Sequence, residues 1–352
     1  MALCAWVGIL GRAAASLAAT VSQAAIGSCD TAKKAVLWGG RALRRGLEGT
    51  MGEVYSLTCA LLWAFGVVLL RRGGETVGPL PLNVFKNTFA TLLMIVTMPL
   101  VGAAFWPAQV ETEHVVILLV SGALGLGIAD TMFLAALNRL GAGRTAVVEC
   151  AYGPSVLLCA ALHPQLQEPV GVGAIGAVVL IAAGISVAAR EGGDRPDEAP
   201  ARRAVREGVA LGLGAIVLMA IGFVMAKPVL EQHGVWWVTL VRFGGGFLVL
   251  IPMSLRPTAR GSVAAILRPG PDWKVVAPAA FVGTYLAMLF WIAGLKHSSA
   301  GTAALLSQTS TFFVVLLAVP MLGERLSARR LFAVLLGFCG ALLVAMPAYS
   351  GA

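Results

Sequence analysis

Residues 275–295 read VVAPAAFVGTYLAMLFWIAGL, a run without a single charged side chain. A helix needs about 20 largely apolar residues to span a bilayer, and this run supplies them. Six more uncharged runs occur along the chain, at residues 54–70, 87–110, 169–189, 208–226, 297–323 and 331–352. The sequence therefore predicts an all-α integral membrane protein that crosses the cell membrane several times.

Composition excludes the other broad classes of protein. Only 12% of the 352 residues are charged, and 58% are apolar, whereas soluble domains carry about 25% charged residues. The net charge of +9 does not indicate a nucleic-acid partner, because membrane proteins collect Lys and Arg in cytoplasmic loops. The six cysteines and four histidines are scattered without metal-binding or disulfide spacing. We expect no nucleic acid, metal or cofactor, and a small-molecule substrate and the lipid bilayer as partners.

Apolar runs and their polar boundaries predict ten transmembrane helices, in two groups of five. A hydrophilic linker, residues 190–207, separates a first half (54–189) from a second half (208–347). The ten predicted helices cover residues 54–71, 80–101, 115–138, 143–162, 169–189, 207–229, 235–255, 274–296, 301–322 and 327–347.

Residues 1–50 differ from the rest of the chain, because they are rich in Ala and carry six Lys and Arg residues. Residues 33–47 have the pattern of a basic amphipathic helix that lies on a membrane surface. Two other interpretations stay open. The segment is either a disordered leader or an extension upstream of a start at Met51, which directly precedes the first span. Arg12 interrupts the apolar stretch that a cleaved signal peptide would need.

The two halves are copies of each other. At a shift of 156 residues Lys86 aligns with Arg242 and Glu168 with Glu324, and at a shift of 158 Ala142-Gly143 aligns with Ala300-Gly301. Random apolar sequence rarely repeats an embedded cation and a loop Glu at one shift. Since each copy has five crossings, the second must enter the membrane from the opposite side, which is typical of transporters with inverted repeats.

The repeat resembles a known family. Residues 322–327 read LGERLS and precede an apolar helix with two glycines, and Arg242-Phe243 lies in the second helix of its repeat. These motifs are similar to those of the drug/metabolite transporter superfamily, in particular its EamA-type carriers. The first copy departs from the pattern, with Gln167 before Glu168 and Lys86-Asn87 in place of Arg-Phe. The resemblance implies two inverted five-helix repeats and a secondary transporter, without naming a substrate.

Four ionisable side chains lie inside predicted spans: Lys86, Asp130, Glu149 and Arg242. Each costs about 2.5–3.5 kcal/mol near a helix centre on insertion scales, so such residues are functional candidates. At about 1.5 Å per residue, the first three lie at similar depths, roughly 9–12 Å from one membrane face. We expect Arg242 at the equivalent depth from the other face.

One cation beside two acids leaves one carboxylate able to take a proton, which is how many carriers couple to a proton gradient. The alternative is a structural pair, Lys86–Asp130 or Lys86–Glu149, that only fixes helices together. Four further polar-tipped side chains in apolar helices are weaker candidates for substrate contact: Trp63, Tyr152, Tyr285 and Gln308. Glu168 and Glu324 lie in loops, and we expect each to cap the helix that follows it.

These features favour a secondary transporter that exports a small metabolite, with proton coupling left open. No nucleotide-binding motif of the G-x-x-x-x-G-K-[ST] type occurs, and an enzyme would need a catalytic cluster that the sequence lacks. The remaining alternative is a non-transporting scaffold or an accessory protein of a lipid-carrier flippase, which needs no charges within the membrane. An internal cavity would favour transport.

Loop charges predict the orientation in the membrane. Sixteen Lys and Arg residues follow the odd-numbered helices, and only two, Lys227 and Lys296, follow the even-numbered ones. Since cations mark the cytoplasmic side, the count predicts a cytoplasmic linker and an external C-terminus. The resemblance implies instead that both termini are cytoplasmic.

Overall fold

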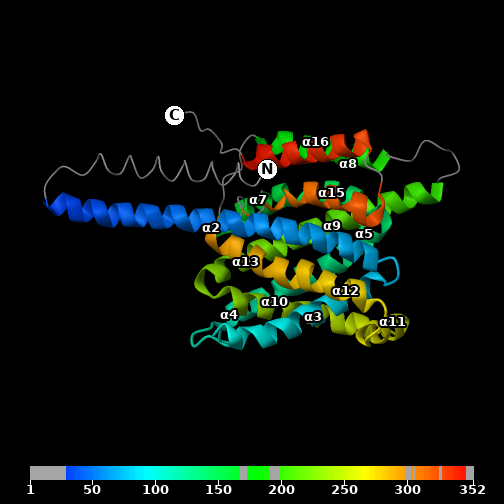
Figure 1. Cartoon of the computed structure of the whole chain (residues 1–352), viewed down its shortest axis with the longest axis horizontal. Coiled ribbons are helices and arrows are strands. Elements are labelled where there is room, and N and C mark those ends of the chain that lie inside the picture. The colour runs from blue at the N-terminus through cyan, green and yellow to red at the C-terminus, as the bar shows by residue number, and fades with distance from the viewer. Residues whose placement is uncertain are drawn as a thin grey trace. The chain divides into compact units, whose positions relative to one another are not determined.

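The computed structural model describes residues 29–166, 173–190, 199–298, 303, 306–324 and 327–345. Every regular element within these ranges is a helix (Figure 1). The chain divides into two units, residues 1–51 and 52–352. All contacts described below lie within the second unit.

Seven segments of the described residues are long and apolar enough to cross a membrane, so the protein is a multi-pass membrane protein. They are Met51–Gly73, Pro79–Leu100, Thr112–Leu140, Ala142–Leu162, Arg202–Gln232, Val235–Ser254 and Trp273–His297. Three shorter apolar helices are Val178–Ala188, Ser310–Leu322 and Leu331–Gly340. Each of the ten predicted spans overlaps one of these segments.

The helices of the first half, in chain order, are α2 (Cys29–Gly73), α3 (Pro79–Leu100), α4 (Thr112–Gly122), the π-helix η1 (Ala123–Ala129), α5 (Asp130–Leu140), α6 (Ala142–Glu149), α7 (Tyr152–Leu162) and α8 (Gly173–Arg190). Those of the second half are α9 (Ala199–Gln232), α10 (Val235–Ser254), α11 (Pro257–Leu267), α12 (Trp273–Ala280), the π-helix η3 (Phe281–Leu286), α13 (Ala287–His297), α15 (Ser310–Leu322) and α16 (Ala328–Ala345).

The structure differs from the predicted helices at five places. Helix α2 begins at Cys29 and includes the predicted amphipathic segment, and α9 begins at Ala199, inside the predicted linker. Helix α11 was not predicted; Pro257 starts it, since proline suits the first turn of a helix. Two predicted helices are interrupted by a turn, 143–162 at residues 150–151 and 301–322 at residues 308–309. Residues 1–28 and 191–198 lie outside the described residues.

The two halves repeat these irregularities. The π-helices η1 and η3 begin 158 residues apart, at Ala123 and Phe281. The turn between α6 and α7 and the turn before α15 are separated by the same shift. Helices α3 and α10 begin 156 residues apart. The irregular elements therefore recur at the same two spacings, 156 and 158 residues, at which the sequence repeats.

Glycine contacts repeat in the same way. Gly66 of α2 touches the backbone of Gly283 in η3, and Gly222 of α9 lies against the backbone of Ser121 and Gly125 beside η1. A β-carbon at either position would overlap these backbone atoms. Because apolar side chains gain little by leaving lipid for protein, such close backbone approach is what holds membrane helices together. Helices α8 and α16 also pack side by side, with Gly184 against the backbone of Ala333 (Figure 1).

Contacts between helix ends show the direction of each half. The end of α2 lies by the end of α5, where Gly74 contacts Asn138. The membrane-crossing part of α9 begins near the same end of α5, since Glu207 of α9 pairs with Arg139 of α5 at 3.9 Å. Helix α2 therefore ends where the spanning part of α9 begins, and these equivalent helices run in opposite directions.

The opposite helix ends meet around two histidines. His114 Nδ1 lies 3.0 Å from His233 Nε2, which joins the start of α4 to the α9–α10 turn. Lys296 Nζ donates to the carbonyl of His233 at 2.8 Å. Burial, followed by the nearby His114, lowers the pKa of His233 below its ordinary value.

Candidate functional site

A cavity of about 150 Å³ lies between the two halves of the second unit. Seven of the eight side chains that the sequence singles out line it: Trp63, Lys86, Asp130, Glu149, Tyr152, Arg242 and Gln308. They come from α2, α3, α5, α6, α7, α10 and the turn before α15. The cavity therefore combines charged groups of the first half with the embedded arginine of the second.

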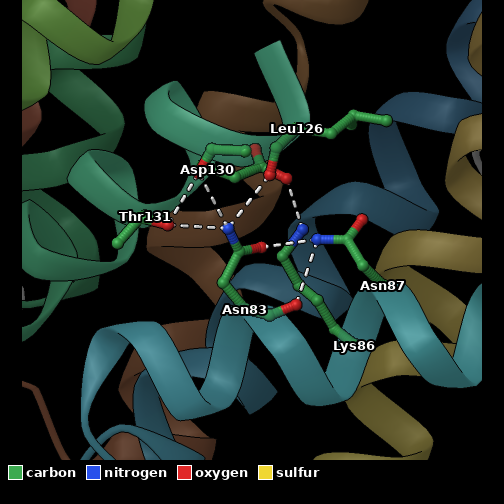
Figure 2. Close-up of polar contacts among 7 residues, drawn as sticks. Asn83, Lys86, Asn87, Leu126, Asp130 and Thr131 are labelled. Atoms are coloured by element: carbon green, nitrogen blue, oxygen red, sulfur yellow. Dashed lines mark hydrogen bonds and ion pairs between the residues drawn. The ribbon is translucent and has the colours of Figure 1, made fainter. Parts of the chain in front are cut away.

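Lys86 and Asp130 form a buried ion pair that joins α3 to α5. Figure 2 shows the pair within a hydrogen-bonded network around Asn83. The Asn83 amide donates to the carbonyl of Leu126 at 3.0 Å and to Thr131 Oγ1 at 2.8 Å. The same amide donates to the carbonyl of Gly127 at 3.2 Å, so Asn83 joins α3 to the π-helix η1.

Glu149 stands apart from this pair. Trp63 Nε1 donates to its Oε1 at 2.8 Å, and its Oε2 is buried without a hydrogen-bond partner. Only 8% of the residue is exposed. Among the described residues no cation lies within ion-pair distance of it, and burying an unpaired charge is costly. Taking up a proton would remove that charge and turn one oxygen into a donor.

Arg242 is the second ionisable residue of the cavity with unpartnered atoms. It is 4% exposed, and its Nε and Nη1 atoms are buried without hydrogen bonds. Its backbone packs against Gly122. Its guanidinium lies beside Gly125, where an added β-carbon would be 3.4 Å from Nη2. The glycines of α4 and η1 thus make room for the arginine. The sequence predicted an embedded cation here but not that, among the described residues, no carboxylate lies within ion-pair distance of it.

Aromatic rings form a wall of the cavity that the sequence analysis missed. Phe223 of α9 and Trp291 of α13 have ring centroids 4.9 Å apart, and the Tyr152 ring lies 5.8 Å from that of Trp291. All three residues line the cavity. Nothing in the sequence distinguishes Phe223 and Trp291 from the many apolar residues that face lipid or the core.

The remaining two candidates have different environments. Gln308 lines the cavity, is 3% exposed, and keeps its Oε1 without a partner. Tyr285 does not line the cavity; its hydroxyl lies 2.9 Å from Thr97 Oγ1 and donates to it. Tyr285 packs instead among Ala90 and Met94 of α3.

Glu324 contacts a helix distant in the chain. Its carboxylate accepts N–H bonds from Ala142 at 2.9 Å and Gly143 at 3.2 Å, at the start of α6. It therefore caps a helix of the first half of the chain. Gly323 allows this turn with φ of +67°, a conformation that favours glycine. Glu168 lies outside the described residues.

In the part of the chain that the structure describes, no group of three or more His, Cys, Asp or Glu side chains could hold a metal ion. The ionisable and hydrogen-bonding groups of the cavity include the Lys86–Asp130 pair, the carboxyl of Glu149, the guanidinium of Arg242 and the amide of Gln308.

Comparisons with known proteins agree with this architecture. A protein of solved crystal structure is 17% identical to the chain, covers 85% of it over 98% of its own length, and superposes with a TM-score of 0.60. That likeness shows a common fold. No curated protein sequence matches the chain significantly. The family model of the EamA-like transporter family matches twice, over residues 50–190 and 206–346. The chain therefore belongs to the EamA-like transporter family.

Proposed function

We propose that the protein is a secondary transporter that moves a small metabolite by alternating access. The two halves act as inverted repeats of five crossings each, and the cavity between them opens to one membrane face at a time. The opposite directions of α2 and α9 and the matching contacts of Gly66 with Gly283 and Gly222 with Gly125 support this arrangement. We place the transporter in the cell membrane, with export as its direction.

One observation carries the proposal: ionisable groups from both halves line one internal cavity. Keeping four such groups inside a membrane costs about 10–14 kcal/mol in total on insertion scales. If these positions only packed helices together, apolar side chains would fill them at a lower free-energy cost of membrane insertion. A non-transporting scaffold has no use for the unpartnered atoms of Glu149 and Arg242, whereas a substrate site does.

Glu149 is the proposed proton carrier. Asp130 already has Lys86 as a partner, so that pair fixes α3 against α5 and holds the Asn83 network in place. Within the described part of the chain, the hydrogen-bond partner of Glu149 is the Trp63 N–H. A carboxyl group with one oxygen unpartnered in a cavity can gain and lose a proton as the cavity faces each side of the membrane in turn.

The test is counterflow in proteoliposomes made with the full chain. Vesicles are loaded with an excess of one unlabelled metabolite and diluted into a trace of the same labelled compound, across a panel of metabolites. Exchange above that of protein-free vesicles, without any ion gradient, is the expected result for at least one compound. Folded protein that exchanges no compound of the panel would favour the scaffold.

A further inference from the structure

The end of the cavity at Arg242 lacks a negative partner. Among the described residues no carboxylate lies within ion-pair distance of the guanidinium, and two of its three nitrogens are buried without a hydrogen bond. Unpartnered buried donors are rare, and each calls for an explanation such as an absent ligand. Gly125 of η1 lies beside Nη2 without a side chain of its own, and Arg242 lines the cavity.

We propose that the substrate is a small organic monoanion whose carboxylate binds Arg242 and whose apolar body has about the size of one aromatic ring. The inference rests on the proposed transport function and names its substrate class. A guanidinium presents parallel N–H groups that match a carboxylate in a two-pronged contact.

Charge balance favours one negative charge. Lys86 and Asp130 neutralise each other in their ion pair. With a proton on Glu149, the cavity keeps a single net positive charge, that of Arg242. One carboxylate balances this charge, whereas a dianion such as a phosphate monoester would leave an unpaired negative charge beside Asp130 and Glu149. A cationic substrate would add to the charge of Arg242.

Size and wall chemistry favour a ring-sized apolar body. A cavity of about 150 Å³ is the size that accepts benzene in other proteins, whereas sites for larger, drug-sized ligands are about 300–1,000 Å³. Tyr152, Phe223 and Trp291 supply three rings at one wall. Edge and face contacts with these rings stabilise an aromatic body beyond the burial of its apolar area. Nucleotide sugars are too large for the cavity in this conformation.

Three probes of equal shape test the charge. Purified full-length protein is titrated with 3-phenylpropionate, its amide 3-phenylpropanamide, and 3-phenylpropylamine, with binding followed by calorimetry and by thermal stabilisation. Only the carboxylate is expected to bind. Arg242→Gln is expected to weaken its binding about ten-fold or more, the usual value of a hydrogen bond to a charged group, and Arg242→Lys less so. Arg260→Gln, the same change on the exposed α11, is the matched control with wild-type affinity.

Each outcome decides the matter. Equal binding of the amide or the amine, no binding of the carboxylate, or wild-type affinity in a folded Arg242→Gln protein would overturn the inference. Arg242→Lys keeps the charge, so it shows whether a loss of binding reflects the lost cation or a misfolded protein. Counterflow of only neutral or cationic metabolites would overturn the inference and leave the transport function standing. Carboxylate binding at Arg242 without any counterflow would overturn transport instead.

Discussion

Replacing Glu149 with Gln tests proton coupling with a minimal change in shape. The Gln side chain keeps an oxygen that accepts the Trp63 N–H, now 2.8 Å from Glu149 Oε1. Its amide nitrogen occupies the place of Oε2, which has no partner to lose. The variant therefore resembles the protonated acid, and we expect it to fold and to exchange substrate. It can no longer carry a proton.

The expected ratio of substrate concentrations across the membrane follows from the pH gradient. One pH unit corresponds to about 1.4 kcal/mol for each proton moved, which is a tenfold ratio of concentrations. In proteoliposomes with a one-unit pH gradient, wild-type protein that moves one proton per substrate should reach about a tenfold accumulation or depletion of substrate. Glu149→Gln should stop at a ratio of about one while its counterflow continues.

Two controls separate coupling from damage. Glu53→Gln changes an exposed acid of α2 outside the cavity and should leave the ratio unchanged. Asp130→Asn leaves Lys86 buried without its anion, so it should lower the free energy of unfolding by about 3–5 kcal/mol. A Glu149→Gln protein that still accumulates substrate as the wild type does would refute the assignment of Glu149.

Three further predictions concern the fold. Glu324→Ala removes two hydrogen bonds to the start of α6 and should reduce stability by about 1–3 kcal/mol; an unchanged thermal midpoint would show that the cap contributes nothing. Gly283→Ala forces a β-carbon onto Gly66 and should cost about 1–3 kcal/mol, whereas Gly261→Ala in open space should cost nothing; equal midpoints would contradict the close contact. A reporter that is active only in the cytoplasm, fused after Ala352, should show low activity, because cations follow the odd-numbered helices. High activity would favour a cytoplasmic C-terminus.

Much of the architecture follows from patterns that the bilayer imposes. Charge-free runs of sufficient length predict spanning helices, and an embedded cation that recurs with a loop Glu at one shift predicts the repeat. The same cost of burying charge explains why Lys86, Asp130, Glu149 and Arg242, chosen from sequence alone, line one cavity. An ionisable side chain within a membrane must find either a partner or a polar cavity.

Other features depend on packing that a pattern does not record. Tyr285 is as polar-tipped as Tyr152, yet its hydroxyl bonds to Thr97 away from the cavity, because the rotation of η3 about its axis decides where each side chain lies. The choice of Asp130 over Glu149 as the partner of Lys86 rests on the π-helical turn of η1. Glu324 caps α6, a contact between segments distant in the chain that the sequence pattern did not predict.

Cys59 offers the most direct measurement of alternating access, because it lines the cavity and is 5% exposed in this conformation. In a variant in which every other cysteine is replaced, a membrane-impermeant methanethiosulfonate reagent is added to right-side-out and, separately, to inside-out vesicles. A permeant thiol reagent gives the total reactive fraction. Alternating access predicts that Cys59 is modified from both sides, since the cavity opens to each face in turn. Modification from one side only, or from neither, would contradict it.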